Sequence, residues 1–100
     1  MIRYRRVLRY RCILRFSLDA DEGTFTGCLA KRLKALGFTK AKRTGEYLLS
    51  CDTQTQLAEA LRGFWDAVGN PKQTFPGKTF PPGVKLDHAW TYCSKVYASA

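Results

Sequence analysis

Hydrophobic and polar residues alternate along residues 9–18. The even positions carry Tyr10, Cys12, Leu14, Phe16 and Leu18, and the odd positions carry Arg9, Arg11, Ile13, Arg15 and Ser17. Successive side chains of a β-strand point to opposite sides, so a period of two is the pattern of a strand with one buried face. The alternation therefore predicts a first strand that buries its even residues and gathers its arginines on the other face.

The alternation does not continue cleanly toward the N-terminus, because Arg6 falls on the apolar face. A strand from residue 2 to residue 18 would also exceed the usual upper length of about 10 residues. We therefore expect a bulge or break near Arg5–Arg6. Residues 1–7 would then form a frayed extension or pair with another chain.

Two later segments space their hydrophobic residues as helices do. One stripe, within residues 24–36, is Phe25, Cys28, Leu29, Leu33 and Leu36, and the other, within residues 53–68, is Leu57, Leu61, Phe64 and Val68. Thr24 or Thr26 is expected to cap the first helix. Asp52 or Thr53 is expected to cap the second, where Thr53 and Gln56 have the spacing of a capping box.

The remaining segments predict a hairpin, a loop and a last strand. Gly37 suits the left-handed position after the first helix. Residues 38–51 predict a hairpin around Thr44–Gly45, where glycine supplies the positive φ of a tight turn. Residues 70–83 are rich in proline and glycine and predict a long loop, whereas the β-branched and aromatic residues of 84–97 predict a strand.

The order strand, helix, strand, strand, helix, strand predicts one α+β domain over residues 1–100. Two βαβ-like halves with right-handed crossovers give a ferredoxin-like βαββαβ sandwich, a four-stranded antiparallel sheet with two helices on one face. Trp90 and Tyr92 share one face of the last strand, and we expect them in the core, where large aromatic residues usually lie. If they faced outward beside the arginines, the combination would suit single-stranded nucleic acid.

The positive charge is concentrated in the first half of the chain. Residues 1–45 hold twelve lysines and arginines against three acidic residues, the rest of the chain holds five of each, and the formal net charge is +9. This asymmetry favours a polyanionic partner such as nucleic acid, whose phosphates guanidinium groups can grip bidentately. The candidate nucleic-acid-binding residues are Arg9, Arg11, Arg15, Lys40, Lys42 and Arg43. A Pro-rich loop folded over that face would remove the site.

The cysteines and the N-terminus bear on the cellular compartment. Cys12, Cys28, Cys51 and Cys93 form no CxxC pair, and each falls in a predicted strand or helix, where cysteine is usually a small buried hydrophobe. Arginines interrupt the apolar stretch that a signal peptide needs, and no uncharged run is long enough to span a bilayer. We therefore expect a cytoplasmic protein with reduced cysteines and no membrane association.

Few residues suggest catalysis. Asp19, Asp21 and Glu22 lie close together and could bind a divalent cation, although a turn before a helix N-terminus favours the same residues. His88 is the single histidine of the sequence, and the order of residues identifies no nucleophile for it. The predicted hairpin lacks the alternating aromatic residues of an RNA-recognition motif.

The stretch RCILRFSLDADEG…CLAKRLKALGFTKAKRTGEYLL combines a strand ending in Asp, a helix ending in LKALGF, and a basic strand that turns into an apolar one. Over roughly residues 11–66 it resembles the ferredoxin-fold family of CRISPR adaptation nuclease-like subunits and virulence-associated protein D. The resemblance implies a homodimer in which Asp19, with its symmetry mate, is the catalytic residue and metal ligand of an endoribonuclease or DNase. Mg²⁺ or Mn²⁺ would be its cofactor.

Three functions therefore compete. The first is a nucleic-acid-binding domain that uses the arginine-lined open sheet face and needs no cofactor. The second is the dimeric metal-dependent nuclease acting through Asp19. The third is a small inhibitor or adaptor that places its basic face on an acidic protein surface. We favour the first. The sequence does not determine whether the ligand is RNA or DNA, whether the protein is a catalyst, or whether it is a monomer or a homodimer.

Overall fold

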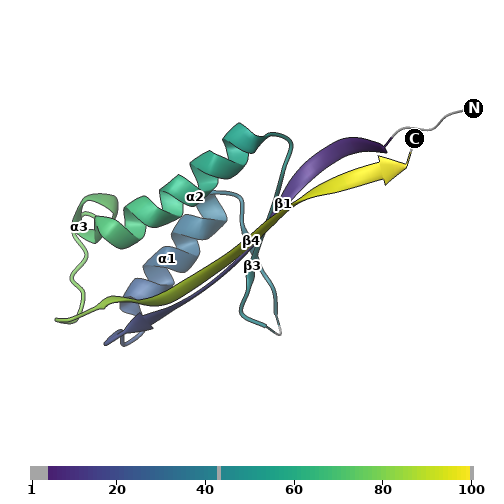
Figure 1. Cartoon of the computed structure of the whole chain (residues 1–100). Coiled ribbons are helices and arrows are strands. Elements are labelled where there is room, and N and C mark those ends of the chain that lie inside the picture. Colours follow the sequence, from purple (N-terminus) through teal and green to yellow (C-terminus); the bar gives the residue numbers. More distant parts are fainter. Residues whose placement is uncertain (1–4, 43, 100) are drawn as a thin grey trace, which may run out of the picture.

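Strands and helices follow one another in the predicted order, as a computed structural model shows for residues 5–42 and 44–99 (Figure 1). Residues 1–4, Arg43 and Ala100 lie outside the described residues, and only the backbone is described for residues 5–8 and 97–99. The elements are β1 (Arg5–Asp19), α1 (Thr24–Ala35), β2 (Thr39–Lys40), β3 (Tyr47–Cys51), α2 (Gln54–Gly69), α3 (Pro71–Thr74) and β4 (Lys85–Ser99). The one addition to the prediction is the short helix α3.

The strands form one antiparallel sheet in the order β2-β3-β1-β4. The first and third strands are therefore central, as the ferredoxin-like arrangement requires. Helices α1 and α2 lie on the same side of the sheet, and no helix of the described chain lies on the other side (Figure 1). This α+β sandwich confirms the predicted fold class. Within the described residues, no helix has the length and apolar character needed to cross a membrane.

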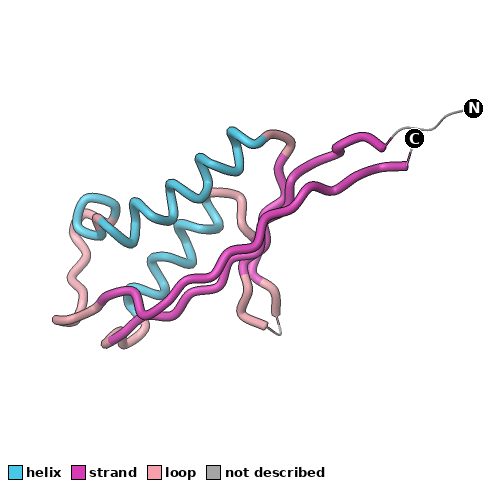
Figure 2. Tube along the Cα trace, viewed as in Figure 1, coloured by secondary structure: helices cyan, strands magenta, loops and turns pink. Residues whose placement is uncertain are grey.

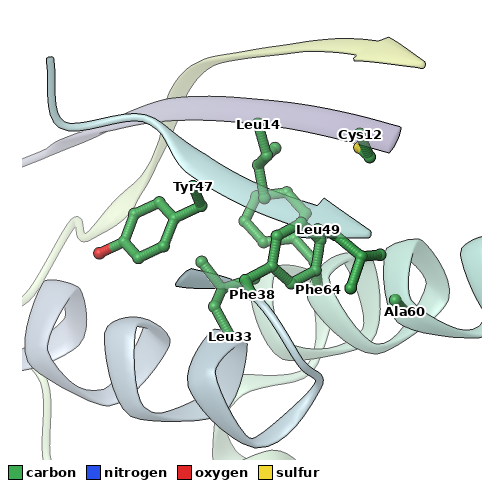
Figure 3. Packing of buried hydrophobic residues seen from close by; sticks show 8 residues of the cluster. All are labelled: Cys12, Leu14, Leu33, Phe38, Tyr47, Leu49, Ala60 and Phe64. Carbon is green, nitrogen blue, oxygen red and sulfur yellow. The ribbon is translucent and has the colours of Figure 1, made fainter. Parts of the chain in front are cut away.

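The core lies between the sheet and the two long helices. Cys12 and Leu14 of β1 are fully buried there, and Leu33 of α1 and Phe64 of α2 contribute from the helical layer (Figure 3). Strand β3 adds Tyr47, which pairs directly with Leu14 and so shares its face. The period of two in the first strand therefore identified the inward face correctly.

Helix α2 packs through smaller residues than its sequence pattern predicted. Its buried residues are Ala60, Gly63, Phe64 and Ala67, whereas Leu57, Leu61 and Val68 are only partly buried. The cause is the close approach of the chain that follows α1: a Cβ placed on Gly63 would lie 2.6 Å from Leu36 Cδ2. Small residues therefore occupy the centre of the contact between the helices, and the larger aliphatic residues flank it.

Strands β1 and β4 pair along nearly their whole length and continue beyond the helices as a two-stranded ribbon (Figure 2). Of the bulge or break predicted near Arg5–Arg6, the structure has a bulge slightly further along β1, and residues 5–7 pair with β4 of the same chain rather than with another chain. The register shifts between Val7 and Arg9, where an extra residue lets the long strand bend and keep its pairing. The ribbon gives the described chain an elongated shape of 63 × 27 × 18 Å.

The two long helices begin with different caps. Thr53 and Gln56 form the predicted capping box of α2, with the Thr53 Oγ1 accepting from the Gln56 backbone N–H at 3.1 Å. The expected threonine cap of α1 is wrong, because Thr24 already lies inside that helix. The carboxylate of Asp21 accepts instead from the backbone N–H groups of Phe25 and Thr26, at 3.0 and 2.9 Å.

The Pro-rich segment of residues 70–83 packs on the helix side of the molecule. After α3, Phe75 and Phe80 lie against Phe25 of α1, with ring centroids 6.1 and 4.8 Å from it. These rings join a second apolar cluster that is centred on Phe25, Leu29 and Ala67. The segment is therefore held against the helices and leaves the opposite face of the sheet uncovered.

Replacing the cap of α1 should destabilise the fold. Asp21→Ala is expected to lower the free energy of unfolding by about 1 kcal/mol, the usual cost of losing an N-cap side chain. Desolvation opposes ionisation, but the hydrogen bonds from Thr26, Phe25 and Gly23 together outweigh it and hold the pKa of Asp21 below its ordinary value. The stabilisation is therefore present above about pH 4 and disappears as the pH falls through the lowered pKa.

Urea unfolding at neutral pH and in acid tests this prediction, with Glu22→Ala as the matched control. Glu22 is the exposed neighbouring carboxylate, and it makes no hydrogen bond within the described residues. The gap between wild type and Asp21→Ala should narrow in acid. An equal loss at Glu22 would show that negative charge near α1, rather than the cap, is responsible.

The cysteines should differ sharply in reactivity. Cys12 pairs directly with Cys93 across β1 and β4, yet Cys12 is buried and Cys93 is exposed. Burial, together with the neighbouring Cys93 thiol, raises the pKa of Cys12 to about 12. Because the thiolate is the nucleophile, iodoacetamide should alkylate Cys93 rapidly in the folded protein and Cys12 only after unfolding. Mass spectrometry of peptides reports both rates, and equal rates under native conditions would contradict the described packing.

Candidate nucleic-acid interface

The face of the sheet that no helix covers is the candidate interface, and we call it the open face. Cys12 points into the core, so its neighbours Arg11 and Ile13 point the opposite way. Directly paired residues share a face, and this rule extends the assignment to β3 and β4. The open face consists of Arg9, Arg11, Ile13, Arg15 and Ser17 of β1, Leu48 and Ser50 of β3, and His88, Trp90, Tyr92, Ser94 and Val96 of β4.

The arginines predicted for this face lie on it together. Arg9, Arg11 and Arg15 are all exposed, and Arg9 Nη1 donates to Ser50 Oγ at 3.2 Å. Within the described part of the chain, no carboxylate forms an ion pair with any of them. Guanidinium groups stay protonated at any physiological pH, so the open face carries fixed positive charge that the described residues do not neutralise.

Trp90 and Tyr92 also lie on the open face, so the expectation that they belong to the core is wrong. Trp90 pairs with Arg15 and Tyr92 pairs with Ile13, and the two aromatic residues are 50% and 56% exposed. The long helices pack mainly over the other strands, so the helix side of β4 offers little apolar surface for large rings. The smaller Ala89 faces that side and packs at the margin of the core.

An apolar row crosses the open face between two of the arginines. Leu48, Ile13 and Tyr92 lie opposite one another on β3, β1 and β4, and Leu48 is itself 39% exposed. Arg11 and Arg15 lie on either side of this row, separated along β1 by about 13 Å. The surface therefore alternates charged and apolar groups instead of forming one uninterrupted basic stripe. The alternation in the sequence already placed Ile13 on the side of the arginines, whereas Leu48 could be placed beside it only from the strand register.

The basic residues of the hairpin do not join the arginines. Lys40 pairs with the buried Tyr47 and therefore lies on the helix side, with its Nζ 5.9 Å from the centre of the Tyr47 ring. Lys42 is exposed in the connection between β2 and β3, and Arg43 lies outside the described residues. Of the predicted set, the structure thus gathers the three arginines of β1 and places Lys40 apart from them.

Lysines gather at a separate place on the helix side. Lys31 and Lys34 of α1 line a shallow cavity of about 580 Å³ together with Lys40, and Phe38 and Tyr47 contribute its apolar lining. Phe38 and Tyr47 are both almost fully buried, whereas the three lysines are exposed. These lysines supply a natural comparison for the arginines, because the two sets lie on opposite sides of the sheet.

A serine, an aspartate and the histidine meet at one end of the open face. Ser17 Oγ donates to Asp87 Oδ2 at 2.8 Å, and His88 Nδ1 lies 2.9 Å from the same oxygen. These hydrogen bonds hold the pKa of Asp87 below its ordinary value. The sequence could not reveal the cluster, because it depends on a register irregularity that leaves Asp87 unpaired between His88 and Leu86.

This cluster is not arranged as a catalytic triad. In a triad the serine and the carboxylate contact different nitrogens of the imidazole. Here Ser17 Oγ lies 3.4 Å from His88 Nδ1, the same nitrogen that faces Asp87, and the hydroxyl already donates its proton to Asp87. The His88 and Asp87 side chains are also 65% and 49% exposed, so water competes for every contact.

Ser17 is therefore expected to remain unlabelled by a fluorophosphonate probe, which reacts with activated serines. The measurement is mass spectrometry of the folded protein after incubation with the probe, with the unfolded protein as the background. Covalent labelling of Ser17 that His88→Ala abolishes would overturn this reading of the geometry. Equal, trace labelling of several serines would agree with it.

The acidic residues after β1 do not assemble a metal site within one chain. Asp19 is exposed and pairs with Lys85, whereas the Asp21 carboxylate caps α1. Among the described residues, no three His, Cys, Asp or Glu side chains lie close enough to hold a metal ion. The donors of a single chain therefore do not fit Mg²⁺ or Mn²⁺ at Asp19. The alternative interpretation of this cluster, a turn before a helix N-terminus, is confirmed for Asp21.

Comparison with known proteins adds no relative whose site could be transferred to this one. No protein-family model, no curated protein and no solved structure matches the chain. The resemblance to the CRISPR adaptation family accordingly stays a prediction, and the function is argued from the geometry of the open face.

Proposed function

We propose that this protein binds nucleic acid through the open face, with Arg9, Arg11 and Arg15 contacting backbone phosphates. The observation that carries the proposal is the grouping of these three exposed guanidiniums on a helix-free sheet face without an ion-pairing carboxylate in the described chain. Arg9 and Arg11 are two residues apart on β1, about 6.6 Å, and their like charges repel one another at that separation. A polyanion lying across the face would relieve that repulsion.

Arginine is the suitable residue for this role. Its planar fork binds two phosphate oxygens at once, and its guanidinium is more weakly hydrated than an ammonium group. Arg9 already has one of its terminal nitrogens oriented by Ser50, which limits the freedom it would lose on binding. The Pro-rich segment does not cover this face, since it is packed on the helix side.

The competing functions lack such support in the described residues. The nuclease needs metal ligands that a single chain does not gather around Asp19. An acidic protein surface could also neutralise the arginines. Protein interfaces also use aromatic residues and arginines, so a protein partner is one of the outcomes that the experiment below distinguishes from nucleic acid.

Removing two arginines should weaken binding and flatten its salt dependence. For a single strand, the slope of log K against log salt is about −0.7 for each phosphate contacted, so Arg11→Gln with Arg15→Gln should reduce its magnitude by about 1.4. Fluorescence anisotropy with labelled RNA and DNA oligonucleotides at several salt concentrations measures both the affinity and the slope.

The matched control is Lys31→Gln with Lys34→Gln, which removes the same charge from exposed residues of α1 on the helix side. This variant should lose affinity only slightly and keep nearly the wild-type slope. If the lysine variant weakened binding as much as the arginine variant, binding would depend on net charge and the open face would not be the site. A protein partner that stays bound to the wild-type protein after nuclease treatment, and does not bind the arginine variant, would favour the adaptor function.

A further inference from the structure

We infer that Trp90 and Tyr92 form a stacking platform for unpaired bases, so that the open face selects single-stranded over double-stranded nucleic acid. This inference rests on the proposed function and specifies its ligand. The two residues stand on the edge strand β4, directly beside the central strand that carries the arginines. The backbone of a strand bound along β1 would therefore lie next to both rings.

The two rings have the arrangement that stacking requires. Their planes are inclined by only 14° and their centroids are 6.5 Å apart. That separation matches the rise of two residues along a strand, about 6.6 Å. The rings are thus held at the spacing of the backbone, with their planes nearly parallel. Because the two rings are nearly parallel, the edge of one ring does not cover the face of the other. Each ring can therefore present a face to a nucleobase.

The exposure of these rings is costly unless a ligand covers them. About half of each residue's surface is exposed, and Tyr92 pairs with Ile13, which pairs in turn with Leu48 on the same face. Contiguous exposed apolar surface on a soluble protein marks a binding site more often than an isolated exposed residue does. The flat face of a nucleobase fits such a surface, because every base has a π-face and stacking needs no particular sequence.

The pairing of Trp90 with Arg15 places a stacking group directly beside a phosphate-binding group. Arg15 lies directly opposite Trp90, and Arg11 lies beyond the Ile13–Tyr92 pair. A phosphate held by an arginine of β1 therefore places its nucleotide one strand spacing, about 4.8 Å, from the aromatic strand. In a duplex the base faces are covered by their neighbours in the stack, so the rings could not use them. Only an unpaired strand can engage both groups.

Trp65 provides a matched control inside the same chain. It is 47% exposed, nearly as much as Trp90, but it belongs to α2 on the helix side of the sheet. The test compares Trp90→Ala, Tyr92→Ala and Trp65→Ala for binding to a fluorescein-labelled oligodeoxythymidylate, its uridine equivalent, and the DNA duplex formed with the complementary strand. Circular dichroism and thermal melting verify that each variant is folded.

A second readout needs no loss-of-function variant. In a Trp65→Phe background Trp90 is the only tryptophan, so its emission reports directly on the open face. Stacking against a base quenches indole fluorescence. We expect saturable quenching by the single strands and far weaker quenching by the duplex at equal nucleotide concentration. Comparing the DNA with the RNA single strand shows which sugar is preferred, and either preference is compatible with the inference.

The expected result is a loss of about tenfold in single-strand affinity for each aromatic substitution, with duplex binding and Trp65→Ala both near wild type. Suppose that single strand and duplex bind equally, that Trp90→Ala has no effect, and that the arginine variant still weakens binding. The stacking inference is then overturned while the proposed function stands. If neither form binds, both fall. If Trp90→Ala and Tyr92→Ala convert a dimer into a monomer in size-exclusion chromatography without changing affinity, a second copy covers the rings and the inference is also overturned.

Discussion

The antiparallel pairing of β1 with β4 is the constraint on which the rest of the structure depends. Because a strand alternates its side chains, one register decides for every residue of both strands whether it faces the helices or the open face. The register that pairs Cys12 with Cys93 sends Leu14 to the core and, in the same step, places Arg15 beside Trp90. A slip of one residue would bury the arginines and expose the core. The apolar side of β1 therefore fixes the position of the charged side.

The two faces of the sheet are stabilised differently, and that difference is the basis of the proposed function. On the helix side the groups are mutually satisfied: Leu14, Leu33 and Phe64 fill the space between sheet and helices, and Phe75 and Phe80 close one end. On the open face the groups are not satisfied by one another: three guanidiniums have no ion-pairing carboxylate among the described residues, and two aromatic rings remain half exposed. The fold tolerates this face because the opposite one supplies the stability. A binding site is the ordinary reason for such an arrangement.

Sequence patterns predicted the parts of the structure that depend on local rules. The period of two in β1, the Thr53–Gln56 capping box and the glycines after α1 and in the hairpin all act within a few residues, and each appears as expected, with Gly37 and Gly45 at φ values of 102° and 70°. The side on which Trp90 and Tyr92 lie could not be predicted in the same way. Alternation gives two candidate faces for a strand, and only its register with β1, more than 70 positions away, selects between them. The side on which Lys40 lies is likewise set by strand pairing, in its case with Tyr47, and the Asp87 irregularity beside Ser17 has no local signal.

The division of the open face between two strands determines how its two kinds of group would act together. Charge on β1 attracts phosphate over roughly 8 Å, the screening length at physiological ionic strength, whereas aromatic stacking requires contact. Neighbouring strands are about 4.8 Å apart, so a backbone drawn to β1 is already within reach of β4. The lysines of α1 cannot assist in this, because the sheet and the core separate them from the rings. Affinity would thus come mainly from β1 and weaken with salt, while the preference for unpaired bases would come from β4 and persist in salt. The edge strand β4 would then determine which class of nucleic acid binds, although the charge of the open face comes from the neighbouring strand β1.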